Sequence, residues 1–191
     1  MEPWVARALA RWPNVPALYG WLRLDRRGRW LIRGEVISRP QIIDTINANY
    51  AADAQGRWYF QNGPQRGYIA LDYAPLILRT DGAGRLYTHT GLAVTAPAAA
   101  FMDEHGALLL TCEHGPGVLE DASLAWALER LHSAGKPTDE TRLAAALAQP
   151  SGMRTAMQLR IGATALPVTR MDVAAMPAHL GFVREPQESP D

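Results

Sequence analysis

Short stretches of alternating apolar and polar residues predict that this chain forms many short strands. Four of the predicted strand pairs are separated by the same pattern, D-x-x-G, within residues 25–30, 53–58, 81–86 and 103–108. The aspartate of such a turn is expected to accept hydrogen bonds from the backbone N–H groups two and three residues later, and the glycine adopts the positive φ that reverses the chain. Each pattern therefore predicts a β-hairpin.

A second pattern follows the first and third turns. Residues 34–40 and 91–97 both read G-x-x-[IV]-[ST]-x-P and lie 57 residues apart, while the turns before them lie 56 residues apart. The second and fourth turns match at a spacing of 50 residues. These spacings indicate an internal duplication, with copies at about 20–73 and 76–122, folded into one compact domain.

Three longer stretches predict helices. Residues 3–12 carry apolar side chains at helical spacing. Ser38 and Gln41 have the spacing of a capping box, which predicts a helix over about 39–50. A leucine pattern predicts another helix over about 122–133.

These elements predict an α+β fold, mostly antiparallel β, built from a duplicated hairpin unit with a helix inserted in the first copy, plus a C-terminal helix-and-hairpin cover. The expected organisation is an N-terminal helix in 1–19, the duplicated hairpin core in 20–137, a helix and hairpin packed on that core in 138–183, and a disordered tail in 184–191. In the second copy we expect Thr95 to cap one short helical turn.

Composition narrows the class of protein. The formal net charge of zero argues against general nucleic-acid binding. No apolar run approaches the length of a membrane-spanning helix. The single cysteine forms no intrachain disulfide, and the N-terminal residues lack a signal-peptide core. The sequence therefore favours a cytoplasmic protein without a membrane or nucleic-acid partner.

Charge is unevenly distributed along the chain. Residues 1–39 carry eight arginines against three acidic groups, and residues 100–140 carry eight acidic groups against two basic ones. Two solvated faces are one interpretation of this pattern. The other is a homodimer in which the basic end of one copy meets the acidic end of the other.

Catalytic and cofactor motifs are missing from the sequence. It has no G-x-S-x-G nucleophile elbow, no G-x-x-x-x-G-K-[ST] phosphate loop and no G-x-G-x-x-G fingerprint. We therefore expect no cofactor and favour a non-catalytic protein.

A metal-dependent hydrolase is the alternative function. Cys112 and His114 lie two residues apart, on one face of a predicted strand, and His105 is expected across the same hairpin. Three such ligands could hold Zn²⁺ with an open fourth position. A small buried cysteine beside an exposed histidine is the simpler interpretation.

Arg39 is the polar residue that best indicates a ligand. It falls at the first turn of the predicted helix, where a cation is electrostatically unfavourable, so it is expected to face a small anionic ligand. The alternative is an internal ion pair with Asp44 or Asp72.

Differences between the two copies suggest further ligand-binding residues. Trp30 and Trp58 of the first copy are leucines in the second, so they could form the wall of a pocket. Asn47, two turns along the helix from Arg39, could face the same pocket. Alternatively, both tryptophans fill the core of the first half.

The order of these motifs resembles a known family. The chain is similar to the proteobacterial domain-of-unknown-function family 1285 in the order of its motifs. These are, in sequence, a D-x-x-G-x-W run at 25–30, the pattern G-x-x-I-x-R formed by Gly34, Ile37 and Arg39, a predicted helix, a D-x-x-G-R-W-Y run at 53–59, and an Ala-Pro pair at 74–75. A sister family of unknown function is the alternative. Residues 71–73 replace the acidic pair that the family has before its Ala-Pro.

The resemblance implies an α+β homodimer with repeated motifs, involved in ligand binding or signal transduction rather than catalysis. Of the candidate residues, it carries over Arg39. The sequence thus favours a non-catalytic cytoplasmic ligand-binding or regulatory protein.

Overall fold

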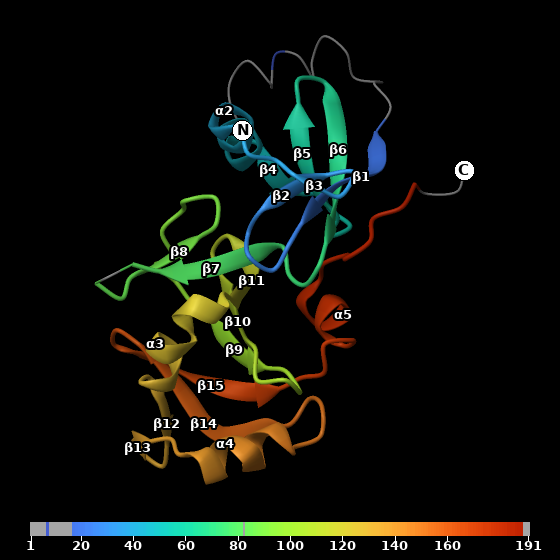
Figure 1. The fold of residues 1–191 in the computed structure, drawn as a ribbon. Helices are drawn as coiled ribbons and strands as arrows, with labels where there is room; N and C mark the ends of the chain where they lie inside the picture. The colour runs from blue at the N-terminus through green and yellow to red at the C-terminus, as the bar shows by residue number, and fades with distance from the viewer. Residues whose placement is uncertain (1–6, 8–16, 82, 189–191) are drawn as a thin grey trace. The chain divides into compact units, whose positions relative to one another are not determined.

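The structure is a computed structural model that describes residue 7 and residues 17–81 and 83–188. The chain divides into two compact units (Figure 1). Unit one comprises Met1–Pro75 and Gly181–Asp191, and unit two comprises Leu76–Leu180. The helix expected over 3–12 lies outside the described residues, except for its position 7.

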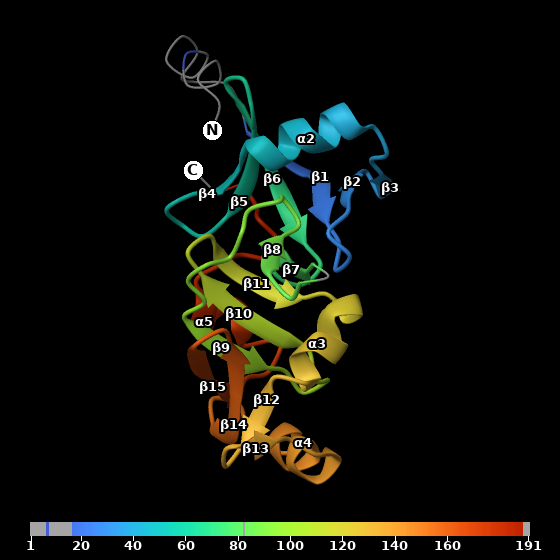
Figure 2. The ribbon, with the colours of Figure 1, turned by 90° about the vertical axis from the view of Figure 1, so that its left-hand side faces the viewer.

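Unit one contains a six-stranded sheet with the order β3-β2-β1-β6-β5-β4. Neighbouring strands are antiparallel except for the central pair, β1 and β6, which run parallel. Helix α2 links β3 to β4, the two edges of the sheet (Figure 2). The elements are β1 (Leu18–Leu24), β2 (Trp30–Ile32), β3 (Glu35–Val36), α2 (Pro40–Ala48), β4 (Tyr50–Ala52), β5 (Trp58–Asn62) and β6 (Gln65–Leu71).

Unit two contains a nine-stranded sheet with the order β13-β12-β14-β15-β9-β10-β11-β7-β8. Its strands are β7 (Leu76–Thr80), β8 (Leu86–Thr88), β9 (Ala99–Met102), β10 (Leu108–Cys112), β11 (Gly115–Leu119), β12 (Leu131–Ser133), β13 (Lys136–Pro137), β14 (Arg154–Ile161) and β15 (Thr164–Arg170). Its helices are the 3₁₀ turn η1 (Asp121–Ser123), α3 (Leu124–Leu128), α4 (Glu140–Leu147) and α5 (Met176–Leu180). Within the described residues, every helix is too short or too polar to cross a membrane.

The α+β fold class is confirmed, and the two sheets share a common strand arrangement. In unit two the strands β8-β7-β11-β10-β9 repeat the order β2-β1-β6-β5-β4 of unit one. The central pair is parallel in both sheets, β7 with β11 and β1 with β6. The remaining strands of unit two extend its sheet beyond β9, because β15 pairs with β9 in parallel.

The four D-x-x-G patterns form four hairpin turns, as predicted, and the turns share the same hydrogen bonds, although the second bonded N–H group lies four residues after the aspartate rather than three. In each turn Oδ1 of the aspartate accepts the N–H groups of the residues two and four positions later, at 2.8 to 3.0 Å. In three of the turns an arginine four residues on also donates its Nε to Oδ2. Burial works to raise the pKa of Asp25 and Asp53, but hydrogen bonds from Arg29 and Arg57 outweigh it, so both pKa values are lowered.

Helix α2 begins differently from the prediction. Arg39, rather than Ser38, is its N-cap residue, and no side chain caps the helix. The capping box with Gln41 is therefore wrong. Instead, Pro40 occupies the first helical position, where its fixed φ suits the helix and its missing N–H costs nothing.

Two further helix predictions are wrong. The helix expected over 122–133 ends at Leu128, and Leu131 begins the strand β12. Pairing with Leu159 of β14 buries Leu131, so burial in a sheet overrides the helical spacing of the leucines. Thr95 caps no helical turn, because the chain runs extended from it into β9.

The C-terminal part follows the prediction more closely. Asp139 caps α4 by accepting the N–H of Arg142 at 2.9 Å. Strands β14 and β15 form the expected hairpin and are part of the nine-stranded sheet. The segment expected as a tail begins with Arg184, whose carbonyl accepts the N–H of Leu71 at 2.8 Å in unit one, whereas 189–191 lie outside the described residues.

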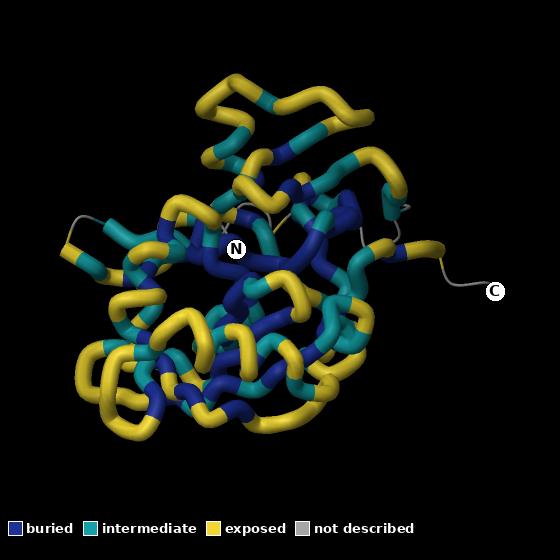
Figure 3. Tube along the Cα trace, turned by 60° about the horizontal axis from the view of Figure 1, so that its bottom comes forward, coloured by how far each residue is buried: buried dark blue, intermediate teal, exposed yellow. Residues whose placement is uncertain are grey.

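Most of the buried hydrophobic residues belong to the strands of the two sheets, and Figure 3 marks the buried residues in dark blue along the chain. One close backbone approach holds the C-terminal segment against unit one. Gly56, with φ of 75°, accepts the N–H of Val183 at 2.9 Å. A Cβ at this position would overlap the carbonyl oxygen of Gly181. Glycine is therefore required at position 56 by both its φ and its neighbour.

We predict that Gly56→Ala destabilises the protein more than Gly106→Ala. Both glycines have positive φ, 75° and 85°, which costs an alanine about 1–2 kcal/mol. Gly106 has open space where the Cβ would lie, whereas Gly56→Ala must also displace the backbone near Gly181, for about 1–3 kcal/mol more. Urea unfolding followed by circular dichroism measures both losses. Equal losses would contradict the close approach.

Candidate functional site

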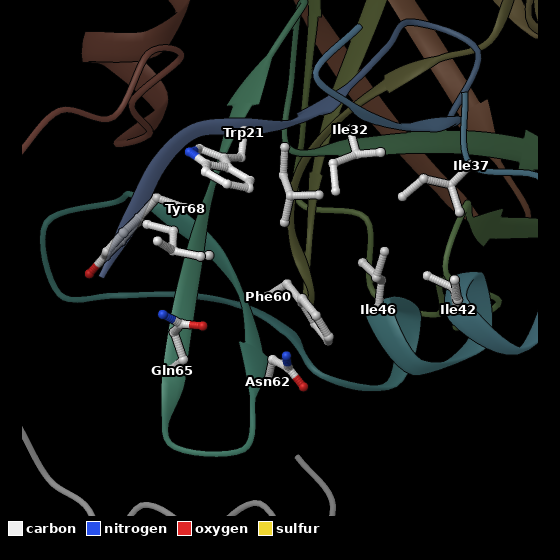
Figure 4. Close-up of a pocket in the computed structure, with 12 residues that line it drawn as sticks. Trp21, Ile32, Ile37, Ile42, Ile46, Phe60, Asn62, Gln65 and Tyr68 are labelled. Atoms are coloured by element: carbon white, nitrogen blue, oxygen red, sulfur yellow. The ribbon is translucent and has the colours of Figure 1, made fainter. Parts of the chain in front are cut away.

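A cavity of about 290 Å³ lies in unit one between α2 and the six-stranded sheet (Figure 4). Its lining is mainly apolar. The aliphatic lining side chains are Leu18, Leu22, Ile32, Ile37, Ile42 and Ile46. Trp21, Phe60 and Tyr68 contribute aromatic rings. Trp21 and Ile42 are 43 % and 42 % exposed, so apolar side chains of the lining also reach the surface.

A bulge in β1 allows three of its side chains to line the cavity. The pairing of β1 with β6 shifts register between Leu18 and Leu22, and Gly20 has φ of 73° there. Regular alternation would place Trp21 and Leu22 on opposite faces of the sheet. The bulge bends the strand, so that both side chains and Leu18 reach the same cavity.

The polar groups of the lining are few. Asn62 and Gln65 lie on either side of the β5–β6 turn, at one end of the cavity (Figure 4). Tyr68 is the titratable residue of the lining, and burial raises its pKa. A lining of carbon, two amides and a neutral phenol suits binding and offers no nucleophile or general base at neutral pH.

Tyr68 ties the cavity wall to the second hairpin turn. Its hydroxyl donates to Oδ2 of Asp53 at 3.0 Å, and the same oxygen accepts Nε of Arg57 at 2.7 Å. The ring of Tyr19 stacks on the Tyr68 ring, with centroids 4.7 Å apart and planes 6° apart. These contacts fix the ring of Tyr68, so this side of the cavity is preformed.

Trp30, Trp58 and Asn47, expected around a pocket, lie beside the cavity rather than in its lining. Both tryptophans are buried, 2 % and 7 % exposed, and both rings contact the ring of Tyr50. Nε1 of Trp30 donates to Oδ1 of Asn47 at 2.8 Å. The three residues thus fill and close the core of unit one, and their ligand-binding role stays a prediction.

Arg39 is exposed at the start of α2, and its carbonyl accepts the N–H groups of Ile42 and Ile43 at 3.1 Å. The ion pair with Asp72 is not formed, because that carboxylate binds Arg23 at 2.8 Å. In the part of the chain that the structure describes, no carboxylate pairs with the Arg39 guanidinium. Its ligand-binding role also stays a prediction.

The three residues proposed for zinc do not come together. His105 lies in the β9–β10 turn, whereas Cys112 and His114 lie at the opposite end of β10. Cys112 Sγ faces the carbonyl of Gly115 at 3.3 Å, and burial raises the pKa of its thiol. Among the described residues, no three His, Cys, Asp or Glu side chains form a group that could hold a metal. The expectation that His105 lies across the same hairpin is therefore wrong.

A carboxylate-binding loop in unit two was not predicted from the sequence. Oε1 of Glu113 accepts the N–H of Thr95 at 2.6 Å and its hydroxyl at 2.8 Å, and Oε2 accepts the N–H of Ala96 at 3.2 Å. Burial works to raise the pKa of Glu113, but these hydrogen bonds lower it to about 2. The repeated G-x-x-[IV]-[ST]-x-P pattern includes both loop residues, but it does not show which carboxylate they bind.

Comparisons with known proteins identify the family and the fold. A family model described as “Protein of unknown function (DUF2946)” matches residues 1–187. A DUF1285 family protein from Silicibacter pomeroyi DSS-3 is 17 % identical, with a TM-score of 0.55 over 82 % of this chain and 84 % of that chain. A DUF1285 family protein from Shewanella baltica OS155 is 13 % identical, with a TM-score of 0.44 over 55 % and 87 %. No curated protein matches. The resemblance to family 1285 is confirmed at the level of the fold.

We predict that Glu113→Gln lowers the free energy of unfolding by about 1–3 kcal/mol at pH 7, because a charged acceptor of three hydrogen bonds is lost. The folded-state pKa is depressed, so the contribution is complete above the ordinary pKa near 4.5 and is lost as the pH falls towards about 2.

The test is urea unfolding at several pH values between 2 and 7, with Glu129→Gln as the control because that side chain is 76 % exposed. The wild type should lose more stability than Glu113→Gln on acidification. Parallel pH profiles would contradict the role of the carboxylate.

Proposed function

This chain belongs to the family described as “Protein of unknown function (DUF2946)”, and we propose that it is a non-catalytic protein that binds a small ligand in the cavity of unit one. The observation that carries the proposal is the preformed cavity of about 290 Å³ with its apolar lining. Clefts of about 300 Å³ lie at the lower end of the range for small-molecule sites, so the ligand is small.

The lining favours a ligand with an apolar body. Covering exposed apolar groups such as Trp21 and Ile42 removes carbon surface from water, at about 25 cal/mol per Å². Asn62 and Gln65 can orient a polar group at one end. The few polar groups would then select the ligand, while the apolar wall supplies most of the binding free energy.

The small anionic ligand expected from Arg39 is part of the same proposal. Ile37 and Ile42 flank Arg39 in the sequence, and both line the cavity. Arg39 is exposed between these two lining positions of the chain, so we place its guanidinium within reach of an anion bound at the cavity. A ligand that combines an apolar body with an anionic group fits both features.

A cytoplasmic regulatory or signal-transduction role and a homodimeric state complete the proposal. A non-catalytic binding protein can regulate another process by signalling whether its ligand is bound. The resemblance of this chain to family 1285 supports such a role. The opposite charge excess of residues 1–39 and 100–140 supports pairing of two copies.

Native mass spectrometry of the untagged protein measures both the number of subunits and any retained ligand. The metal-dependent hydrolase is not proposed, since the structure separates His105 from Cys112 and His114.

We predict that wild-type protein binds octan-1-ol and that Ile42→Trp abolishes this binding. Ile42 lines the cavity and is 42 % exposed, so an indole there would block the cavity with little strain on the core. Asp44→Trp is the matched control, because Asp44 is exposed on the same helix outside the lining. Isothermal titration calorimetry measures the three affinities. If Ile42→Trp binds octan-1-ol as well as Asp44→Trp does, the cavity is not the site.

A further inference from the structure

The loop that contains Arg39 has a counterpart in unit two, and the two loops share a sequence pattern and the backbone angle of their first glycine. Residues 34–40 and 91–97 share the pattern G-x-x-[IV]-[ST]-x-P. Their first residues, Gly34 and Gly91, have φ of 88° and 87°. Ser38 corresponds to Thr95 by this alignment, and Arg39 corresponds to Ala96.

Hydrogen bonds support the same alignment. The N–H of Ile37 donates to the carbonyl of Trp30 at 2.8 Å in unit one, and the N–H of Val94 donates to that of Leu86 at 2.9 Å in unit two. The strand order around the loops is also the same in both sheets. The two loops can therefore be compared residue by residue.

The loop of unit two binds a carboxylate. Two backbone N–H groups and one hydroxyl, from Thr95 and Ala96, surround the two oxygens of Glu113 at 2.6 to 3.2 Å. Glu113 comes from the β10–β11 turn, directly after Cys112. This contact shows which chemical group the loop backbone accommodates: a carboxylate with both oxygens engaged.

The loop of unit one has the same donors but no internal carboxylate. The β5–β6 turn corresponds to the β10–β11 turn, so the position of Glu113 is taken by Gly63, which has no side chain. In the described ranges, no acceptor is hydrogen-bonded to the N–H or hydroxyl of Ser38 or to the N–H of Arg39. Arg39 also places a guanidinium where unit two has the methyl group of Ala96.

The cavity adjoins both the loop and the turn of unit one. Ile37, the loop residue directly before Ser38, belongs to the lining of the cavity, and so do Asn62 and Gln65 on either side of the turn (Figure 4). In unit two the Glu113 side chain connects the corresponding turn and loop. In unit one, residues of both the loop and the turn line the cavity, so a molecule bound there can supply the missing carboxylate.

We propose that the ligand of unit one is a small carboxylic acid, whose carboxylate binds the N–H groups of Ser38 and Arg39, the Ser38 hydroxyl and the Arg39 guanidinium, while its apolar body fills the cavity. This rests on the proposed function and adds the chemical class of the ligand. The size of the cavity favours a free small acid over an acidic side chain of a partner protein.

The experiment compares octanoate with octan-1-ol, two ligands of the same chain length that differ in the carboxylate. Calorimetry at pH 7 should show wild type binding octanoate about tenfold or more tightly than octan-1-ol, as expected for charged hydrogen bonds. Binding of both ligands with equal affinity would overturn the carboxylate assignment and leave the cavity as an apolar site. Binding of neither ligand would overturn the proposed function as well.

Three variants test whether the loop of residues 34–40 causes the preference for octanoate over octan-1-ol. Arg39→Ala removes the guanidinium and keeps the N–H, whereas Arg39→Pro removes both, and the φ of −78° at this position suits proline. Ser38→Ala removes the hydroxyl. We expect the octanoate preference to fall several-fold in Ser38→Ala and Arg39→Ala and to fall further in Arg39→Pro, with unchanged affinity for octan-1-ol.

Arg26→Ala is the matched control, because it removes an equal charge from unit one, at a residue that stacks on Tyr73 away from the loop. Thermal unfolding midpoints confirm that each variant folds. If Arg39→Pro does not fold, Ser38→Ala and Arg39→Ala still decide the question. A preference that survives in these variants, or one that Arg26→Ala lowers equally, would overturn the loop as the carboxylate site.

Discussion

The fold depends on one interaction that occurs four times, the capture of backbone N–H groups by the aspartate of each hairpin turn. Several of the strands that these turns join are only three to five residues long. Such short hairpins are marginally stable alone, because few cross-strand contacts offset the loss of conformational entropy. A carboxylate that binds two N–H groups, and in three turns an arginine, closes each hairpin locally. The hairpins can then pair into the two sheets.

The two units share one strand arrangement but differ in the loop that follows its edge strand. Both sheets have a parallel central pair and the same order of five strands. In unit two the loop after β8 binds the carboxylate of Glu113, so the unit satisfies its own donors. In unit one α2 follows the corresponding loop, Gly63 replaces the acid, and a cavity remains between the helix and the sheet. The two units therefore differ in whether this loop has a carboxylate partner within its own unit.

Sequence patterns predicted the local elements well where the controlling contacts are local. The four turns, the start of α4 and the β14–β15 hairpin depend on residues within a few positions of one another. The helix over 122–133 was wrong, because Leu131 gains more by pairing with β14 than by continuing a helix. The zinc hypothesis was wrong for a similar reason. The full length of β10 separates His105, in the turn before the strand, from Cys112 and His114 at its other end.

Local patterns in the sequence were sufficient to predict the α+β class, the positions of the hairpins and the correspondence between the two loops, because glycine, proline and aspartate constrain the backbone within one turn. The three-dimensional arrangement was needed to show that Trp30 and Trp58 belong to the core, that the cavity lies between α2 and the sheet, and that Thr95 and Ala96 bind Glu113. Each of these depends on side chains from strands far apart in the sequence. Their pairing is set by the competition of all apolar surfaces for burial, which no single segment specifies.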